Sequence, residues 1–135
     1  PMDAVRPGSD ESADVLNRKI AEYTKAVVDG RPCFHISLVL DVSPNCDCHD
    51  ENDVPIVPNV GMFASFDPVA LDQACADGVN AMPVNPGSVL DDPAHGRACG
   101  GDHFHLNHPE TDWEVALDHA EKLGLGSRKY ELVRI

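Results

Sequence analysis

Basic residues are scarce in this 135-residue sequence. Ten Lys and Arg side chains stand against 23 Asp and Glu side chains, which gives a formal net charge of −13. A surface this acidic repels phosphate backbones and anionic lipid headgroups, so we expect neither nucleic acid nor a membrane surface as a partner. Aromatic residues are also few, at 5%. The core should therefore consist mainly of aliphatic side chains.

Several familiar sequence signals are missing. No apolar run approaches the ~18 residues of a membrane-spanning helix, and the first residues lack the basic-then-apolar pattern of a signal peptide. We therefore expect a cytoplasmic protein, in which thiols stay reduced. The sequence also lacks a glycine-rich phosphate loop, a nucleophile elbow, a His-Glu-x-x-His helix and a ferredoxin-type cysteine run. The sequence therefore contains none of these catalytic motifs that would indicate a reaction.

The hydrophobic pattern predicts one α/β domain, with a small mixed sheet and helices packed on it. The expected elements, in chain order, are a helix at 9–28, a strand at 33–42, a strand at 60–64, a helix at 68–82, a long connection at 83–110, a helix that starts at Thr111 and a strand at 129–135. The run 33–42 is almost continuously apolar, which favours a strand that is buried on both faces.

The spacing of apolar residues in the first helix gives this helix one apolar stripe. Its members are Leu16, Ile20, Tyr23 and Val27.

Two later helices have clear start signals. Asp67 followed by Pro68 is typical of a helix cap with proline in the first turn, and Thr111 with Glu114 has the spacing of a capping box. Asp67 and Asp72 also form a carboxylate pair, which suits acid–base chemistry where the surroundings separate the two pKa values. The cap role already accounts for Asp67, whereas Asp72 has no such structural explanation.

The most informative stretch is Cys46-Asp47-Cys48-His49, with Asp53 shortly after it. Two cysteines one residue apart project to the same side of an extended backbone. Paired thiolates suit zinc or an iron–sulfur cluster. We therefore predict a metal site with Cys46, Cys48, His49 and Asp53 as candidate ligands, completed from elsewhere in the chain or from another chain. The alternative is a pair of unliganded thiols in a polar turn, because the usual Cys-x-x-Cys zinc spacing is absent.

The connection 83–110 contains a second group of potential ligands: Cys99, His95, His103, His105 and His108. In an extended segment His103 and His105 share a face. One interpretation is a second metal site, and the other is a flexible surface loop that is rich in histidine. Cys33, His35 and Cys75 lie among apolar residues, and core packing is the expected role for these three.

Four blocks of the sequence resemble the domain-of-unknown-function family 362: residues 43–48, 55–61, 64–74 and 124–132. Members of that family are often labelled iron–sulfur-centre proteins. They are usually longer, and many carry a ferredoxin-like cysteine segment upstream. The resemblance implies that this chain is the C-terminal part of a longer protein. It also implies that a ferredoxin-like segment or a redox partner protein is the partner.

These observations give a leading functional hypothesis and two alternatives. The leading one is a metal- or iron–sulfur-associated domain for electron transfer or cluster handling, with Cys46 and Cys48 as ligands. The first alternative is a metal-dependent enzyme that acts on a small molecule and uses the acidic loop 50–53, Asp67 or Asp72, and the histidines. The second is a metal-free domain that binds a partner protein.

Overall fold

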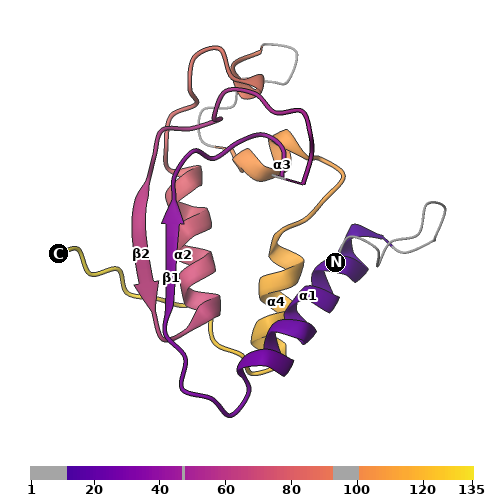
Figure 1. The fold of residues 1–135 in the computed structure, drawn as a ribbon, viewed down its shortest axis with the longest axis vertical. Coiled ribbons are helices and arrows are strands. Elements are labelled where there is room, and N and C mark those ends of the chain that lie inside the picture. The colour runs from indigo at the N-terminus through magenta and orange to yellow at the C-terminus, as the bar shows by residue number, and fades with distance from the viewer. Residues whose placement is uncertain (1–11, 47, 93–100) are drawn as a thin grey trace.

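The computed structural model describes residues 12–46, 48–92 and 101–135. Its elements are α1 (Ala13–Val28), β1 (His35–Val39), β2 (Gly61–Ser65), α2 (Pro68–Asn80), the 3-10 helix η2 (Val89–Asp91), α3 (His103–Asn107) and α4 (Glu114–Lys122). Helices packed on a small sheet confirm the predicted α/β fold class. Helix α2 packs on the sheet, and α1 pairs with α4 on the other side of α2 (Figure 1). None of the described helices has the length and apolarity needed to cross a bilayer.

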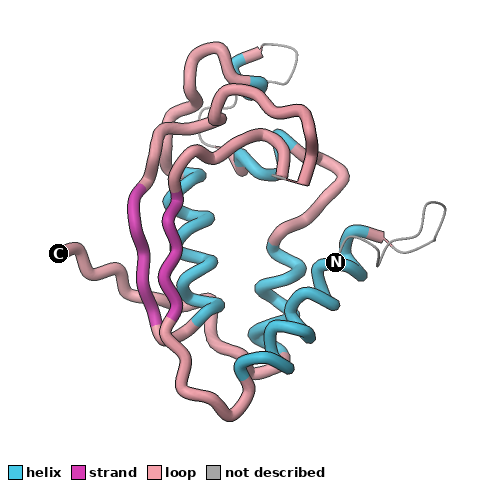
Figure 2. The backbone as a smooth tube through the Cα atoms, viewed as in Figure 1, coloured by secondary structure: helices cyan, strands magenta, loops and turns pink. Residues whose placement is uncertain are grey.

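Strands β1 and β2 form a two-stranded antiparallel ladder, in which His35 lies opposite Ser65 and Leu38 opposite Met62. The ladder lies in front of α2 in the view of Figure 2. Side chains alternate between the inner face, which α2 covers, and the opposite face. We call the opposite face the outer face; it consists of Phe34, Ile36, Leu38, Leu40, Met62, Ala64 and Phe66.

The prediction that the strand at 33–42 is buried on both faces is wrong for the described part of the chain. Along β1 the side chains alternate between half-buried and exposed positions, and Val39 alone is fully buried. The physical reason is that helix α2 packs on only one face of the sheet. The apolar outer face stays largely exposed.

Two aliphatic clusters form the core, in line with the low aromatic content. One lies between the sheet, α2 and the loop before β2, and it comprises Val39, Ile56, Val57, Val79 and Leu90. The other lies where α1, α2 and α4 meet, and it comprises Ala21, Val69, Leu117 and Ala120. Burying a Val, Leu or Ile side chain stabilises a fold by about 1.5–3 kcal/mol. The two clusters therefore hold the sheet and the helix pair on either side of α2.

Helix α1 displays most of its apolar stripe at the surface. Ile20, Tyr23 and Val27 are more than half exposed and Leu16 is half-buried, whereas Ala21 is buried. This orientation arises because α1 packs against α4 through the face that carries Ala21, and two helices approach closely where the contact residue is small. The stripe that the spacing predicts therefore lies largely on the exposed side of α1.

The capping box predicted at the last helix does not form. The backbone N–H of Glu114 donates to Oδ1 of Asp112 at 2.9 Å, and Trp113 occupies the cap position of α4. The Thr111 hydroxyl instead donates to the carbonyl of His108 at 3.1 Å. A carboxylate two residues ahead of a backbone N–H forms a local turn that competes with a Thr cap.

The tail at 129–135 does not form the predicted strand, since it pairs with neither described strand. It is fixed to α2 by a side-chain contact, in which the Tyr130 hydroxyl donates to Oδ2 of Asp77 at 2.7 Å. This contact raises the pKa of Tyr130 to about 12, because the carboxylate accepts the phenol proton and disfavours the phenolate. A side-chain anchor thus takes the place of ladder pairing.

Candidate functional site

The segment that holds the two predicted thiolate ligands follows β1 and rests against α3. The carbonyl of Pro44 accepts two hydrogen bonds from that helix end, one from Nδ2 of Asn107 at 2.5 Å and one from Nε2 of His108 at 2.8 Å. Pro44 itself is buried. The turn is therefore anchored at its base, although it extends into solvent.

Within this turn Cys46, Cys48 and His49 are all exposed. The backbone N–H of His49 donates to the Cys46 carbonyl at 2.9 Å, which closes the turn around the two cysteines. Nδ1 of His49 lies 3.3 Å from Oε1 of Glu51. Asp53 is exposed and its Oδ1 accepts from the next backbone N–H, that of Val54, at 2.7 Å. The turn keeps Cys46, Cys48 and His49 close in the chain, while the Asp53 carboxylate makes a local backbone contact.

No three His, Cys, Asp or Glu side chains converge on a point that would hold a metal ion, as far as the described residues go. Asp47, between the two cysteines, lies outside those residues, as do His95 and Cys99. A closed zinc site needs four ligands. The metal site at Cys46, Cys48, His49 and Asp53 therefore stays a prediction. Further donors would have to complete such a site.

His103 and His105 do not share a face, so the prediction of an extended pair is wrong. Asp102 starts helix α3 by accepting from the backbone N–H groups of Phe104 and His105, and helical geometry separates positions two residues apart. His103 is 2% exposed and its Nε2 donates to the Met82 carbonyl at 2.9 Å. His105 is exposed. His103 therefore packs inside the fold and cannot act with His105 as a surface ligand pair.

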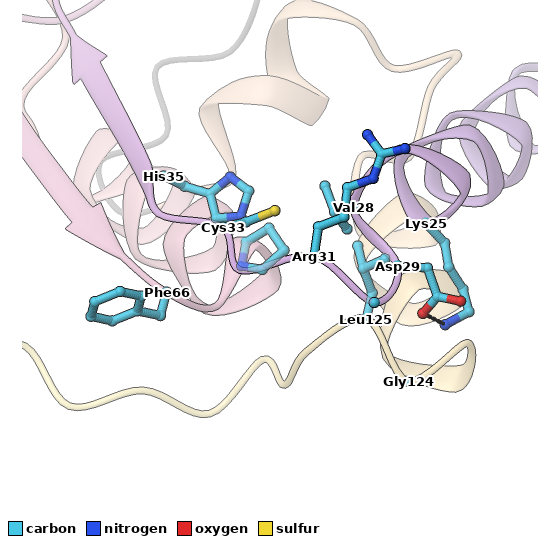
Figure 3. A pocket seen from close by; sticks show the side chains of 11 residues that line it. Lys25, Val28, Asp29, Arg31, Cys33, His35, Phe66, Gly124 and Leu125 are labelled. Atoms are coloured by element: carbon cyan, nitrogen blue, oxygen red, sulfur yellow. Dashed lines mark hydrogen bonds and ion pairs between the residues drawn. The ribbon is translucent and has the colours of Figure 1, made fainter.

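A hollow of about 150 Å³ opens between the end of α1, the start of β1 and the start of α2. Figure 3 shows the Cys33 sulfur directed toward the α1 side of this hollow, with His35 two residues further along the chain, at the start of β1. Phe66, Pro68 and Leu125 supply apolar walls, whereas Lys25, Asp29 and Arg31 line the side of α1. The lining is thus more polar than that of a typical small-molecule site, and the volume is below the usual range.

A smaller hollow of about 60 Å³ shares Pro68 and Leu125 with the first and continues between α1 and α4. Asp72 borders it, and the pKa of this carboxyl is raised because neighbouring side chains remove water from it; His35 opposes the shift. Asp72 is nevertheless exposed to solvent. The combination gives a carboxyl that holds its proton more tightly than usual beside an accessible gap.

Cys75 lies one turn further along α2, on the covered side of the sheet, and forms a cluster of polar side chains with His35, Ser37 and Asp72. Burial raises the pKa of the Cys75 thiol, and the carboxylate of Asp72 adds to the shift, while a hydrogen bond with Ser37 opposes it. Nε2 of His35 is buried and has no hydrogen-bond partner among the described residues. Such an atom is costly to bury and calls for a ligand, a water molecule or a functional role.

The start of α2 joins two blocks that lie far apart in the sequence. Oδ1 of Asp67 accepts from the backbone N–H groups of Val69 and Ala70 at 2.9 and 3.0 Å, which confirms the predicted cap. Oδ2 of the same carboxylate accepts from the backbone N–H of Ser127 at 2.9 Å. Gly126 lies so close to this carboxylate that a Cβ would collide with it. Asp67 thus connects the helix start to the C-terminal block.

The residues that build the thiol turn, both strands and most of α2 lie in one matched segment. A family model described as a domain of unknown function, DUF362, matches residues 4–77, more than half of the chain. The chain belongs to the DUF362 family. No curated protein and no solved structure matches it.

The DUF362 match contains the Cys46–Cys48 turn and most of the lining of the hollow beside Cys33 and His35, whereas Gly124 and Leu125 of that lining lie outside the match. The sequence did not lead us to predict the hollow, because Cys33 and His35 lie in an apolar run, for which core packing is the expected role. A signal was nonetheless available. Cys33, His35 and Ser37 alternate with apolar residues, so three polar side chains share one face of an apolar strand.

Proposed function

We propose that this DUF362 chain is a metal- or iron–sulfur-associated domain that serves in electron transfer or cluster handling. Cys46 and Cys48 supply its thiolates, and His49 and Asp53 are the accompanying candidate donors. The observation that carries the proposal is the exposed turn with its two cysteines, anchored through Pro44 to α3. Exposed thiols on a fixed base suit a site that is shared with another ligand set.

The turn offers an incomplete site, and this shapes the proposed role. Zinc and iron–sulfur clusters usually take four protein ligands. Cys46, Cys48 and His49 provide fewer than four, so we expect a ferredoxin-like segment or a redox partner protein to donate the others. Cysteine thiols stay reduced only in a reducing compartment, and we place the protein in the cytoplasm for that reason.

Metal analysis of matched cysteine variants tests the proposal. Cobalt(II), a spectroscopic substitute for zinc, and anaerobic iron–sulfide reconstitution should each give thiolate-to-metal absorption in the wild-type chain. The double variant Cys46→Ser/Cys48→Ser should lose this absorption and the bound metal. The control Cys33→Ser/Cys75→Ser changes two half-buried thiols. This control variant should keep the thiolate-to-metal absorption and the bound metal. Equal metal content in the two double variants would contradict the proposal.

The hollow beside His35 favours a second candidate function, an enzyme acting on a small molecule. Two groups are suited to proton transfer: Nε2 of His35, which has no hydrogen-bond partner among the described residues, and the carboxyl of Asp72 at the adjoining smaller hollow, whose pKa is raised. Small-molecule binding measured by ligand-observed NMR, with Asp72→Asn and His35→Gln as variants, tests it. Binding that both variants leave unchanged would count against this function.

A further inference from the structure

The outer face of the sheet is entirely apolar. Its seven side chains come from alternating positions of the two strand segments, and none is charged or polar. The six large ones are between 44% and 79% exposed. The rings of Phe34 and Phe66 contact each other with centroids 4.9 Å apart, which makes the face continuous at that end.

The size of this face is that of an interface rather than of scattered surface residues. An aromatic side chain presents roughly 150–250 Å², and Ile, Leu and Met present somewhat less, so the six partly exposed side chains leave on the order of 600 Å² of apolar surface. That is at the upper end of the largest patch on a typical monomer, about 300–600 Å². It is also close to the roughly 800 Å² that each partner gives to a standard interface.

We infer that a second copy of this chain covers the outer face, so that the two sheets pack face to face in a two-fold dimer. Self-association suits this surface because a two-fold contact pairs a patch with itself. Ala64 is the only small residue of the face and lies opposite Ile36. In the inferred dimer its short side chain leaves room for the Leu38 or Met62 side chain of the other copy, and symmetry repeats the contact.

Charge agrees with this choice of surface. Each copy carries a net charge of −13, and two such copies repel each other at any charged face. The outer face contributes no charge to the contact. The remaining repulsion acts at longer range, where salt screens it. The dimer is therefore expected to strengthen as the salt concentration rises, because screening and apolar burial act in the same direction.

Sedimentation velocity of the full 135-residue chain tests the inference. The wild-type chain should sediment as a monomer–dimer equilibrium between 1 and ~500 µM, with a lower dissociation constant in 0.5 M than in 0.05 M NaCl. The variant Leu38→Glu, whose position is 64% exposed in the monomer, should stay monomeric over that range. The control Val27→Glu adds the same charge at a 63% exposed apolar position on α1 and should dimerise like the wild type.

A milder variant guards against misfolding as the cause. Leu38→Ala/Met62→Ala adds no charge and should raise the dissociation constant at least tenfold, since central interface residues dominate binding energy. Its far-ultraviolet circular dichroism should match that of the wild type. The wild-type chain remaining a monomer throughout would overturn the inference and leave the face to another polypeptide or to solvent. A dimer that survives Leu38→Glu, or that Val27→Glu abolishes equally, would overturn it as well. None of these readouts involves Cys46 or Cys48.

Discussion

The two faces of the β1–β2 ladder depart from the usual distribution of polar and apolar side chains. In an antiparallel sheet with one covered face, apolar residues normally point to the core and polar residues to water. Here the inner face, under α2, holds His35, Ser37 and Ser65 beside Val39 and Phe63, whereas the outer face holds apolar residues alone. Polar groups on a covered face are typical of a site that uses them, and an open apolar face is typical of an interface.

The inner face has an apolar end and a polar end. Val39 and Phe63 lie at the end near the aliphatic cluster around Val57. His35 and Ser65 lie at the other end, next to the hollow and the start of α2. Apolar burial at one end thus offsets the cost of desolvating polar groups at the other. The arrangement leaves the polar end accessible without exposing the core.

Truncating one residue on each face gives the largest expected contrast. Val39 is buried, so Val39→Ala should lower the free energy of unfolding by about 2 kcal/mol through lost burial and a small cavity. Leu38→Ala removes more atoms from the outer face but should cost less than about 0.5 kcal/mol in the monomer. Urea denaturation at 1 µM protein, the lower limit of the range in which dimerisation is expected, measures both. Equal losses would mean that the outer face is covered within a single chain.

The cap of α2 holds the helix over the inner face, and its loss should rank second. Asp67→Ala removes the acceptor of two helix N–H groups and of the Ser127 N–H. We expect a loss of about 1–2 kcal/mol in the free energy of unfolding, as for other helix caps. The control Glu131→Ala removes an exposed carboxylate from the tail and should change the stability little. A Glu131 variant as destabilised as the Asp67 variant would contradict the cap assignment.

Local signals in the sequence predicted part of this architecture correctly. The Asp67-Pro68 start, the helix that follows it and the strand before it depend on neighbouring residues, and the structure has all three. The open outer face was mispredicted, because an apolar pattern shows that a surface avoids water and does not show what covers it. The contact of Asp67 with Ser127 joins residues 60 positions apart. No local pattern encodes such a pairing.

Thiol reactivity distinguishes the inner face from the exposed turn. The pKa of Cys75 is raised by burial and by Asp72, so less thiolate forms at pH 8 and alkylation slows. We expect iodoacetamide to modify Cys75 at least tenfold more slowly than Cys46 or Cys48, which are exposed. Peptide mass spectrometry at timed intervals gives each rate separately. In Asp72→Asn the Cys75 rate should rise, and an unchanged rate would show that Asp72 does not act on this thiol.

The smallest expected effect is a change in the pH dependence of stability at Asp72. Its pKa is raised in the folded state above the ordinary value of 3.8, mainly by desolvation. The folded state therefore binds this proton more tightly, and the resulting stabilisation is complete below about pH 3.8 and is lost as the pH rises through the folded pKa. Asp72→Asn should consequently be slightly more stable than the wild type at pH 7, and this advantage should shrink as the pH falls toward 4. Urea denaturation across this range measures the difference, with Glu131→Gln as the control for removing one negative charge. An advantage that is the same at every pH, or that Glu131→Gln reproduces, would trace the effect to net charge and would remove Asp72 from the polar group on the inner side.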